Sequence, residues 1–158
     1  MRLASTLLLA LLALAPALRA ADLKLVRIWP EWRTAESFTR ISEYLGGPEN
    51  TSGQTVLRSQ PAERAGFYFL TRTETKSAIA GARIELQVLL PGVEKSKTFS
   101  FAATLPAGSH VTLTGVTGKD WPGEKTTPVA WHLAVITADG TVLASEQSFL
   151  WAKPAETK

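Results

Sequence analysis

The sequence contains no cysteine, one methionine and two histidines among its 158 residues. The absence of cysteine excludes disulfides, thiolate nucleophiles and cysteine-ligated zinc. The patterns H-E-x-x-H and G-x-S-x-G and the phosphate-binding loop are absent as well. From the sequence we therefore assign no catalytic residue, no metal ligand and no cofactor, and we expect an apolar core alone to hold the fold.

Long apolar runs are missing everywhere except at the start of the chain. There, Met1-Arg2 precedes a run of mostly Leu and Ala over residues 3–18. Small residues follow near its end, at 15–17 and 20–21. These are the parts of a secretory signal peptide, whereas a spanning helix needs about 20 apolar residues. We expect cleavage after Ala17 or Ala20 and no transmembrane segment in the remaining chain. The alternative is an uncleaved N-terminal helix.

Neither sign of charge is in clear excess. The whole chain has 17 Lys and Arg against 14 Asp and Glu, and loss of Arg2 and Arg19 with the signal peptide leaves a formal net charge of +1. A nucleic-acid interface needs basic residues concentrated on one face, and here they are scattered. The sequence therefore argues against a nucleic-acid partner. An Ala/Leu-rich signal before a cysteine-free domain is typical of bacterial export, so we expect the periplasm, the cell surface or the extracellular space.

A short helix is predicted near the start of the mature chain. Phe38, Ile41 and Leu45 fall at helical spacing within residues 34–45, and a Gly-Gly-Pro sequence follows as a stop. Residues 29–33, which include a Trp-Pro pair, are predicted to form a corner between this helix and the first strand.

Strands and turns account for the rest of the mature chain. Residues 83–90 are typical, because Ile84, Leu86 and Val88 share one face while charged and polar side chains occupy the other. The same reasoning predicts strands at residues 23–29, 54–59, 66–75, 83–90, 98–105, 109–116, 129–137 and 142–151.

The alternation also predicts which side chains of the later strands face the core. In residues 109–116, it places Val111 and Leu113 inside and Thr112 and Thr114 outside.

The last hairpin is predicted to turn through a three-residue loop, 138–140, with Gly140 in the left-handed conformation. That register pairs Val135 with Leu143 and His132 with Glu146. It keeps Glu146 off the apolar face, which a two-residue loop would not do.

About seven or eight short strands separated by frequent turns describe a β-sandwich. We therefore expect a mainly β fold, a single antiparallel β-sandwich with one short N-terminal helix. The expected segments are the signal peptide at 1–20, an N-terminal strand, corner and helix at 21–53, the sandwich body at 54–152 and a flexible tail at 153–158.

At the level of architecture, residues 54–151 resemble the immunoglobulin-like and fibronectin-III-like domains of exported bacterial proteins. The resemblance rests on the strand spacing and on Trp131 in a late strand. The Cys…Trp…Cys pattern of true immunoglobulin domains is absent, and the resemblance implies no particular activity.

Tryptophan is the one enriched residue type, with five in the chain. Trp121 lies in a polar loop bounded by glycine and proline, next to Lys119 and Asp120. An exposed indole beside such hydrogen-bonding groups suits a sugar ring, and Trp32 is a second candidate. The alternative is that these indoles cover an open end of the sandwich.

This sparse chemistry favours an exported, non-enzymatic binding or structural module whose partner is an envelope protein or a glycan. One alternative is a carbohydrate-binding module that uses Trp121. Another is a small hydrolase, for which His132 and Glu146 would form an acid–base pair. A further alternative is strand exchange with another subunit through the apolar strand at residues 23–29.

Overall fold

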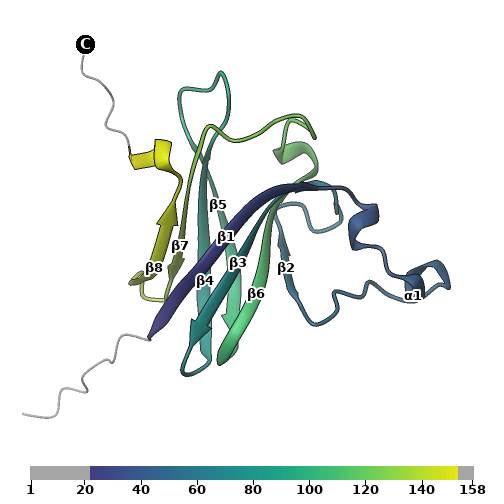
Figure 1. Cartoon of the computed structure of the whole chain (residues 1–158), viewed down its shortest axis with the longest axis horizontal. Coiled ribbons are helices and arrows are strands. Elements are labelled where there is room, and N and C mark those ends of the chain that lie inside the picture. The colour runs from purple at the N-terminus through teal and green to yellow at the C-terminus, as the bar shows by residue number, and fades with distance from the viewer. Residues whose placement is uncertain (1–21, 153–158) are drawn as a thin grey trace, which may run out of the picture.

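The computed structural model describes residues 22–152, so the expected signal peptide and C-terminal tail lie outside the described residues. Eight strands form two four-stranded sheets (Figure 1). The first sheet has the order β1-β3-β6-β2 and the second β5-β4-β7-β8. The mainly β architecture predicted from the sequence is thereby confirmed.

Five of the strands lie within one residue of the predicted bounds. The strand predicted at 83–90 begins four residues earlier, and the one predicted at 142–151 ends four residues earlier, where a helical turn follows instead. The first sheet contains β1 (Leu23–Arg33), β2 (Thr55–Arg58), β3 (Gly66–Thr75) and β6 (Gly108–Thr117). The second contains β4 (Ile79–Leu89), β5 (Lys97–Leu105), β7 (Ala130–Ile136) and β8 (Val142–Gln147). Short helical turns complete the described chain: η1 (Glu36–Phe38), α1 (Ile41–Tyr44), η2 (Gly118–Asp120) and η3 (Phe149–Ala152).

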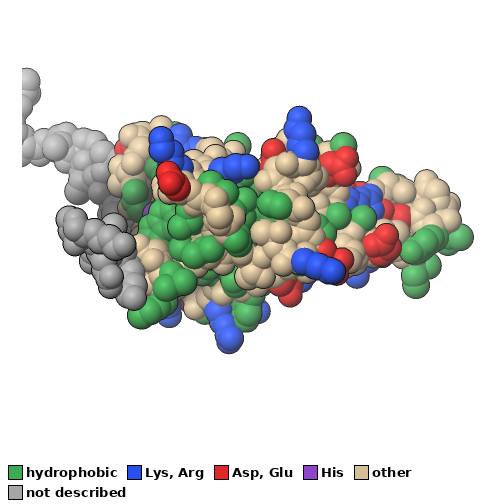
Figure 2. All heavy atoms as spheres, turned by 90° about the horizontal axis from the view of Figure 1, so that it is seen from above, with side chains coloured by type: hydrophobic (Ala, Val, Ile, Leu, Met, Phe, Trp, Pro, Cys, Tyr) green, Lys and Arg blue, Asp and Glu red, His purple; other side chains and the backbone are tan. Residues whose placement is uncertain are grey.

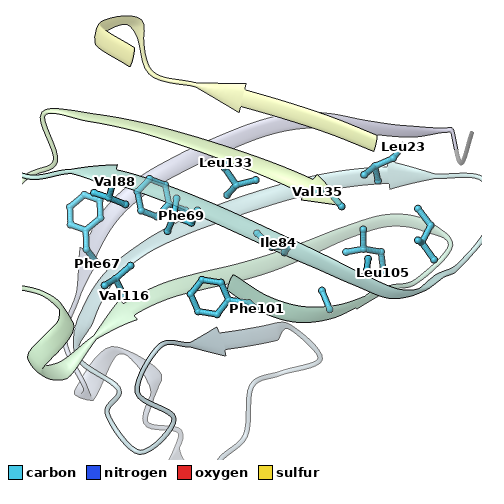
Figure 3. Packing of buried hydrophobic residues seen from close by; sticks show 14 of the residues in the cluster. Leu23, Phe67, Phe69, Ile84, Val88, Phe101, Leu105, Val116, Leu133 and Val135 are labelled. Atoms are coloured by element: carbon cyan, nitrogen blue, oxygen red, sulfur yellow. The ribbon is translucent and has the colours of Figure 1, made fainter. Parts of the chain in front are cut away.

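The two sheets pack face to face around one apolar core. Figure 3 shows side chains of both sheets pointing into the space between them, among them Phe69 and Val116 from the first sheet and Ile84 and Leu133 from the second. Burial of this apolar surface is the main stabilising contribution, since the chain has no cysteine to form a disulfide.

β1 is longer than predicted because the expected corner at residues 29–33 continues as strand. Pro30 lies within β1 and pairs with Phe69 of β3. Proline lacks an N–H, yet an edge strand tolerates it because one side of the strand needs no partner. β1 is an edge of the first sheet and is paired within its own chain. This pairing argues against donation of residues 23–29 to another subunit.

The sandwich is not wholly antiparallel, which corrects the sequence-based expectation. β2 pairs with β6 in parallel, with Thr55 opposite Thr112 and Arg58 opposite Gly115. The segment between β1 and β2, residues 34–54, crosses the outer face of the first sheet and delivers β2 to the far edge (Figure 1). We call this segment the arm. A parallel neighbour requires a long crossover, and alternation in a sequence carries no sign of strand direction.

The predicted helix at residues 34–45 is broken within the arm. It forms the turn η1 and the single helical turn α1, separated at Thr39, which has an extended backbone. Of the apolar residues at helical spacing, Phe38 is buried, whereas Ile41 and Leu45 are exposed. Only η1 packs on an apolar surface, formed by Tyr68 and Leu113, whereas α1 buries no residue. The helical spacing therefore does not correspond to one buried face.

The predicted faces of β6 are reversed. Thr114 pairs with Phe69 on the side of the main core, and Leu113 pairs with Leu70 on the outer face. Both are fully buried, Thr114 on the side of the main core and Leu113 because the arm covers the outer face. With both faces covered, burial no longer separates apolar from polar positions, and alternation alone assigns the faces wrongly.

The last hairpin follows the predicted register only next to its turn. The loop ends at Gly140, whose φ is +90°, and Ile136 pairs with Val142 as expected. A β-bulge then shifts the pairing by one residue, so that Leu133 lies opposite Glu146 and His132 opposite Gln147. Glu146 therefore lies on the core side of β8. Because β8 is an edge strand, Glu146 still remains exposed to solvent.

Tyr68 is the centre of a second apolar cluster, between the arm and the outer face of the first sheet. Its ring lies 4.8 Å from that of Phe38, and Leu113 completes the buried part of the cluster. The Tyr68 ring crosses directly over Gly115 of β6, where an added Cβ would lie 2.3 Å from Cε1. Glycine at this position therefore allows the ring to lie flat on the sheet.

Substitution of Gly115→Ala should destabilise the fold by about 1–3 kcal/mol, because the methyl group overlaps the Tyr68 ring. Urea unfolding measures this loss. In a Tyr68→Ala background the added cost of Gly115→Ala should largely vanish, since the overlap is gone. An equal cost in both backgrounds would mean that the strain has another origin.

Candidate functional site

Trp121 closes one end of the main core. Its side chain is 4% exposed and stacks on Phe67 with ring centroids 4.6 Å apart. A buried indole has no free face for a sugar ring. The placement therefore corresponds to the alternative in which Trp121 covers the end of the sandwich.

Trp32 belongs to the same end of the core. It pairs with Phe67 across β1 and β3 and packs against the main core. The indole nitrogens of Trp32 and Trp121 are both buried without a hydrogen-bond partner among residues 22–152. The structure thus places both predicted tryptophans beside Phe67, Trp121 as a core residue and Trp32 as a partly buried residue packed against the core.

The polar neighbours of Trp121 are engaged in the fold or point to solvent. Asp120 accepts a hydrogen bond from Gln60 Nε2 at 2.8 Å, which lowers the pKa of its carboxyl group. Lys119 is exposed. Asp120 therefore ties the turn η2 to the loop after β2, a structural role that does not require a ligand.

The candidate acid–base pair is not assembled. His132 lies opposite Gln147, and the β-bulge puts Glu146 on the other face of β8. The His132 ring instead stacks on Trp151, with centroids 5.8 Å apart. Across the described part of the chain, no three His, Asp or Glu side chains lie close enough to hold a metal ion.

Three of the four most exposed apolar side chains of the described structure lie on the arm; the fourth is Phe149, after β8. Ile41, Tyr44 and Leu45 have exposed fractions of 82%, 75% and 85%. Figure 2 shows a group of hydrophobic side chains at the end of the molecule where the arm projects. We call these three residues the arm tip. Large apolar residues gathered on a projecting element are typical of an interaction site.

Glu43 holds the arm tip to the loop before β3. Its carboxylate forms an ion pair with Arg64 Nη1 at 2.7 Å and accepts hydrogen bonds from the backbone N–H groups of Arg40 and Asn50. The hydrogen bond from Arg64 is the main reason that the pKa of Glu43 is lowered. One side chain therefore closes the turn α1 and attaches it to the sandwich.

Arg58 of β2 holds the second half of the arm. It forms a two-pronged ion pair with Glu49, with Nη2–Oε1 and Nη1–Oε2 distances of 2.6 and 3.1 Å. Its Nε donates to the hydroxyl of Tyr68 at 3.0 Å, and its guanidinium lies 5.0 Å from the centre of the Phe38 ring. The hydrogen bond from Arg58 lowers the pKa of Glu49, and Glu49 in turn raises the pKa of Arg58.

The arrangement therefore presents an apolar tip on a braced support. Glu43 and Glu49 are both paired with arginines, so the tip is bordered by neutralised charges rather than by free carboxylates. A fixed apolar tip avoids part of the ordering cost of binding, because the side chains are already placed. Such an arrangement is suited to contact with another apolar surface.

The arm tip could not be identified from the sequence, although its residues carried a signal. Ile41 and Leu45 share the helical spacing of Phe38, and this spacing predicts one common face rather than a buried Phe38 and an exposed tip. The Gly-Gly-Pro stop after Leu45 limits the helix to less than the length at which a whole apolar face is normally buried. That limit was the available indication that part of this apolar stripe would remain uncovered.

Comparison of the sequence with protein-family models and with curated proteins found no match in either set. Within residues 22–152, no helix has the length and apolar character needed to cross a bilayer.

The arm should detach from the sandwich in acid. The pKa values of Glu43 and Glu49 are lowered by their arginine partners, so these pairs stabilise the attached arm above the ordinary value of 4.5. That contribution is lost as the pH falls below 4.5 through the lowered pKa values. We expect NMR amide shifts of residues 41–54 to move together in this range while those of β4 and β7, in the other sheet, stay unchanged.

Glu49→Gln provides the matched test of this mechanism. It should loosen the arm already at neutral pH and weaken the acid transition, whereas Asp22→Asn, which removes the exposed carboxylate paired with Lys76, should leave the arm transition as it is. An arm transition that is unchanged in Glu49→Gln would contradict the role given to the Arg58–Glu49 pair.

Tyr68 should ionise only in strong alkali. Burial raises the pKa of its phenol above the ordinary value of 10.0. A raised pKa means that this group stabilises the fold fully below that value and stops doing so as the pH rises through the folded-state pKa. Phenolate absorbance measured against Tyr68→Phe isolates this residue from Tyr44. The prediction fails if the absorbance step missing in Tyr68→Phe lies at or below 10.0.

Proposed function

We propose that the chain is an exported, non-enzymatic β-sandwich of the bacterial envelope that binds a protein partner through the arm tip. The exposure of Ile41, Tyr44 and Leu45 on a braced arm is the observation that supports this proposal. Tyrosine is a typical anchor at the centre of protein interfaces, and the two aliphatic side chains beside it add apolar surface for a partner to cover. The pattern of residues 1–20 supports export.

We also propose that the sandwich is of the immunoglobulin-like or fibronectin-III-like type. If β2 is left aside, β1-β3-β6 facing β5-β4-β7-β8 corresponds to the order A-B-E facing C′-C-F-G. The Tyr68 hydroxyl donates to the backbone oxygen of Arg64, four residues upstream, much as in the tyrosine corner of such domains. In this chain the motif lies on β3, which corresponds to strand B rather than F, and β2 occupies the edge beside strand E.

A carbohydrate partner is the second candidate, and one observation favours it. Tyr44 and Phe149 are exposed aromatic residues, with exposed fractions of 75% and 83%, and could stack on sugar rings. The arm tip nevertheless contains two aliphatic residues beside Tyr44, and the acidic groups next to it are engaged in ion pairs. A protein partner therefore accounts for more of the surface. The hydrolase alternative has no assembled pair of groups to support it.

A photo-crosslinking amino acid placed at Leu45 in the exporting bacterium tests the proposal. We expect a defined protein adduct from Leu45 and none from Val142, which is 56% exposed on β8 and serves as the matched position. With the captured protein in purified form, Ile41→Ser should weaken binding by about thirtyfold, since truncation of an interface anchor costs about 2 kcal/mol.

Folding of the variant separates binding from stability. Because Ile41 is exposed, Ile41→Ser should change the free energy of unfolding by less than about 0.5 kcal/mol. Adducts that are the same from Leu45 and Val142 would rule out the arm tip as the interface. Retardation of the protein in polysaccharide gels, abolished by Tyr44→Ser, would favour the glycan candidate instead.

A further inference from the structure

The four edge strands of the sandwich differ in their protection against pairing with another chain. Exposed edges are normally blunted by bulges, proline, charges that point to the core, or short length. β1 has a bulge after Leu25 and contains Pro30, β8 has a bulge and Glu146 on its core side, and β2 is only 4 residues long. Three of the edges are therefore protected.

β5 lacks these devices over most of its length, and the one irregularity in its pairing lies at its end, between Ile79 and Ala82 of β4. It is 9 residues long, contains no proline, and pairs with β4 without interruption from Lys97 to Ala103. Its one charged residue, Lys97, is at its first position. Its outer face carries only small uncharged side chains, Thr98, Ser100, Ala102 and Thr104. The free side of β5 is thus a long, regular row of backbone groups available for pairing.

A cleft lies beside this edge. It has a volume of about 480 Å³ and is lined by β2 and the residues after it on one side and by the middle of β5 on the other: Val56, Leu57, Arg58, Pro61, Ser100, Phe101 and Ala102. Leu57 is only partly buried and packs against the main core from the β2 side. A strand added to β5 would lie opposite β2 and cover Leu57.

The strands that border the cleft limit what can occupy it. β5 packs against β6, and β2 lies beyond it (Figure 1). Consider a second copy that pairs with β5 through its own β5 about a two-fold axis. The first sheets of both copies would then lie on the same side, and the β6 and β2 strands of the second copy would overlap with β2 of the first. A single extended strand meets no such obstacle.

Both ends of the described chain lie away from the cleft. The described chain begins with β1 and ends after β8, which are the edges on the opposite side of both sheets from β2 and β5.

We propose that β5 and this cleft accept one extended segment of a partner protein as an additional strand of the second sheet. Backbone hydrogen bonds to β5 provide the affinity, and alternate side chains provide the fit. Inward side chains of the segment are apolar, since they cover Leu57 and Phe101. Outward ones are small and polar, to match Thr98 and Ser100. The site does not involve the arm tip and so goes beyond the proposed function.

A peptide with the sequence of residues 97–105 is a suitable probe, because it alternates apolar and small polar side chains in the required way. We expect it to shift the NMR resonances of β5 and to slow amide exchange there, when added to the mature chain. A peptide of the same composition with the alternation broken should have no effect.

Ser100→Lys and Ser145→Lys form a matched pair of variants. Both serines are exposed on edge strands of the second sheet, the first on β5 and the second on β8. A lysine on β5 should weaken peptide binding by about threefold or more, because it places an unmatched charge beside the incoming strand, and a lysine on β8 should not.

Four results would overturn the proposal. They are the absence of binding by the alternating peptide, equal binding by both lysine variants, resonance shifts confined to β1 or β8, and a dimer in analytical ultracentrifugation that Ser100→Lys dissociates. The last result would assign the β5 edge to a second copy of this chain.

Discussion

Tyr68 links the sandwich to the arm through both its ring and its hydroxyl group. Its ring rests on Gly115 and against Phe38, so the aromatic part joins β3 and β6 to the arm. Its hydroxyl accepts from Arg58 and donates to the backbone oxygen of Arg64, at 3.0 and 2.7 Å. These are the two arginines that pair with Glu49 and Glu43. The bonds of Arg58 to Glu49 and Tyr68 depend on one another, since a buried arginine or phenol that loses its partner is costly.

This connection explains why the arm tip can remain apolar and exposed. An unattached loop with three large apolar side chains would fold back onto the sandwich to cover them. Here the attachment points are occupied by Phe38 and by the ion pairs, and Gly47 closes the turn by donating to the backbone oxygen of Ser42. The arm thus holds Ile41, Tyr44 and Leu45 away from the sheet. This placement of the arm leaves apolar surface exposed to water, which is unfavourable, and a bound partner would cover that surface.

The sequence predicted the strands well because most of them have one buried face. β3 and β5 were located to within a residue, and the loop ending at Gly140 was found from its composition. The errors arose where a second surface intervenes. Leu113 and Thr114 are both buried, so alternation could not assign them, and Glu146 sits on an edge where a charge on the core side still reaches solvent.

The candidate site was harder to predict than the fold for a related reason. Trp121 was conspicuous because it stands in a polar loop, yet local polarity does not report whether an indole finds a ring such as Phe67 to stack on. The arm tip had the opposite character, since an apolar stripe next to Phe38 is indistinguishable in sequence from a buried one. In both cases exposure depends on tertiary neighbours that are distant in the chain.

The path of the arm connects the two surfaces proposed for binding. Because the chain crosses the outer face of the first sheet before it forms β2, that strand arrives parallel to β6 and ends after 4 residues. A strand so placed extends the first sheet past β5 but receives no counterpart in the second sheet. The crossing that exposes the arm tip therefore also leaves the cleft beside β5 open. Loss of the Tyr68 connection would free the arm and alter both surfaces, whereas substitutions at Ile41 or Ser100 would affect one surface only.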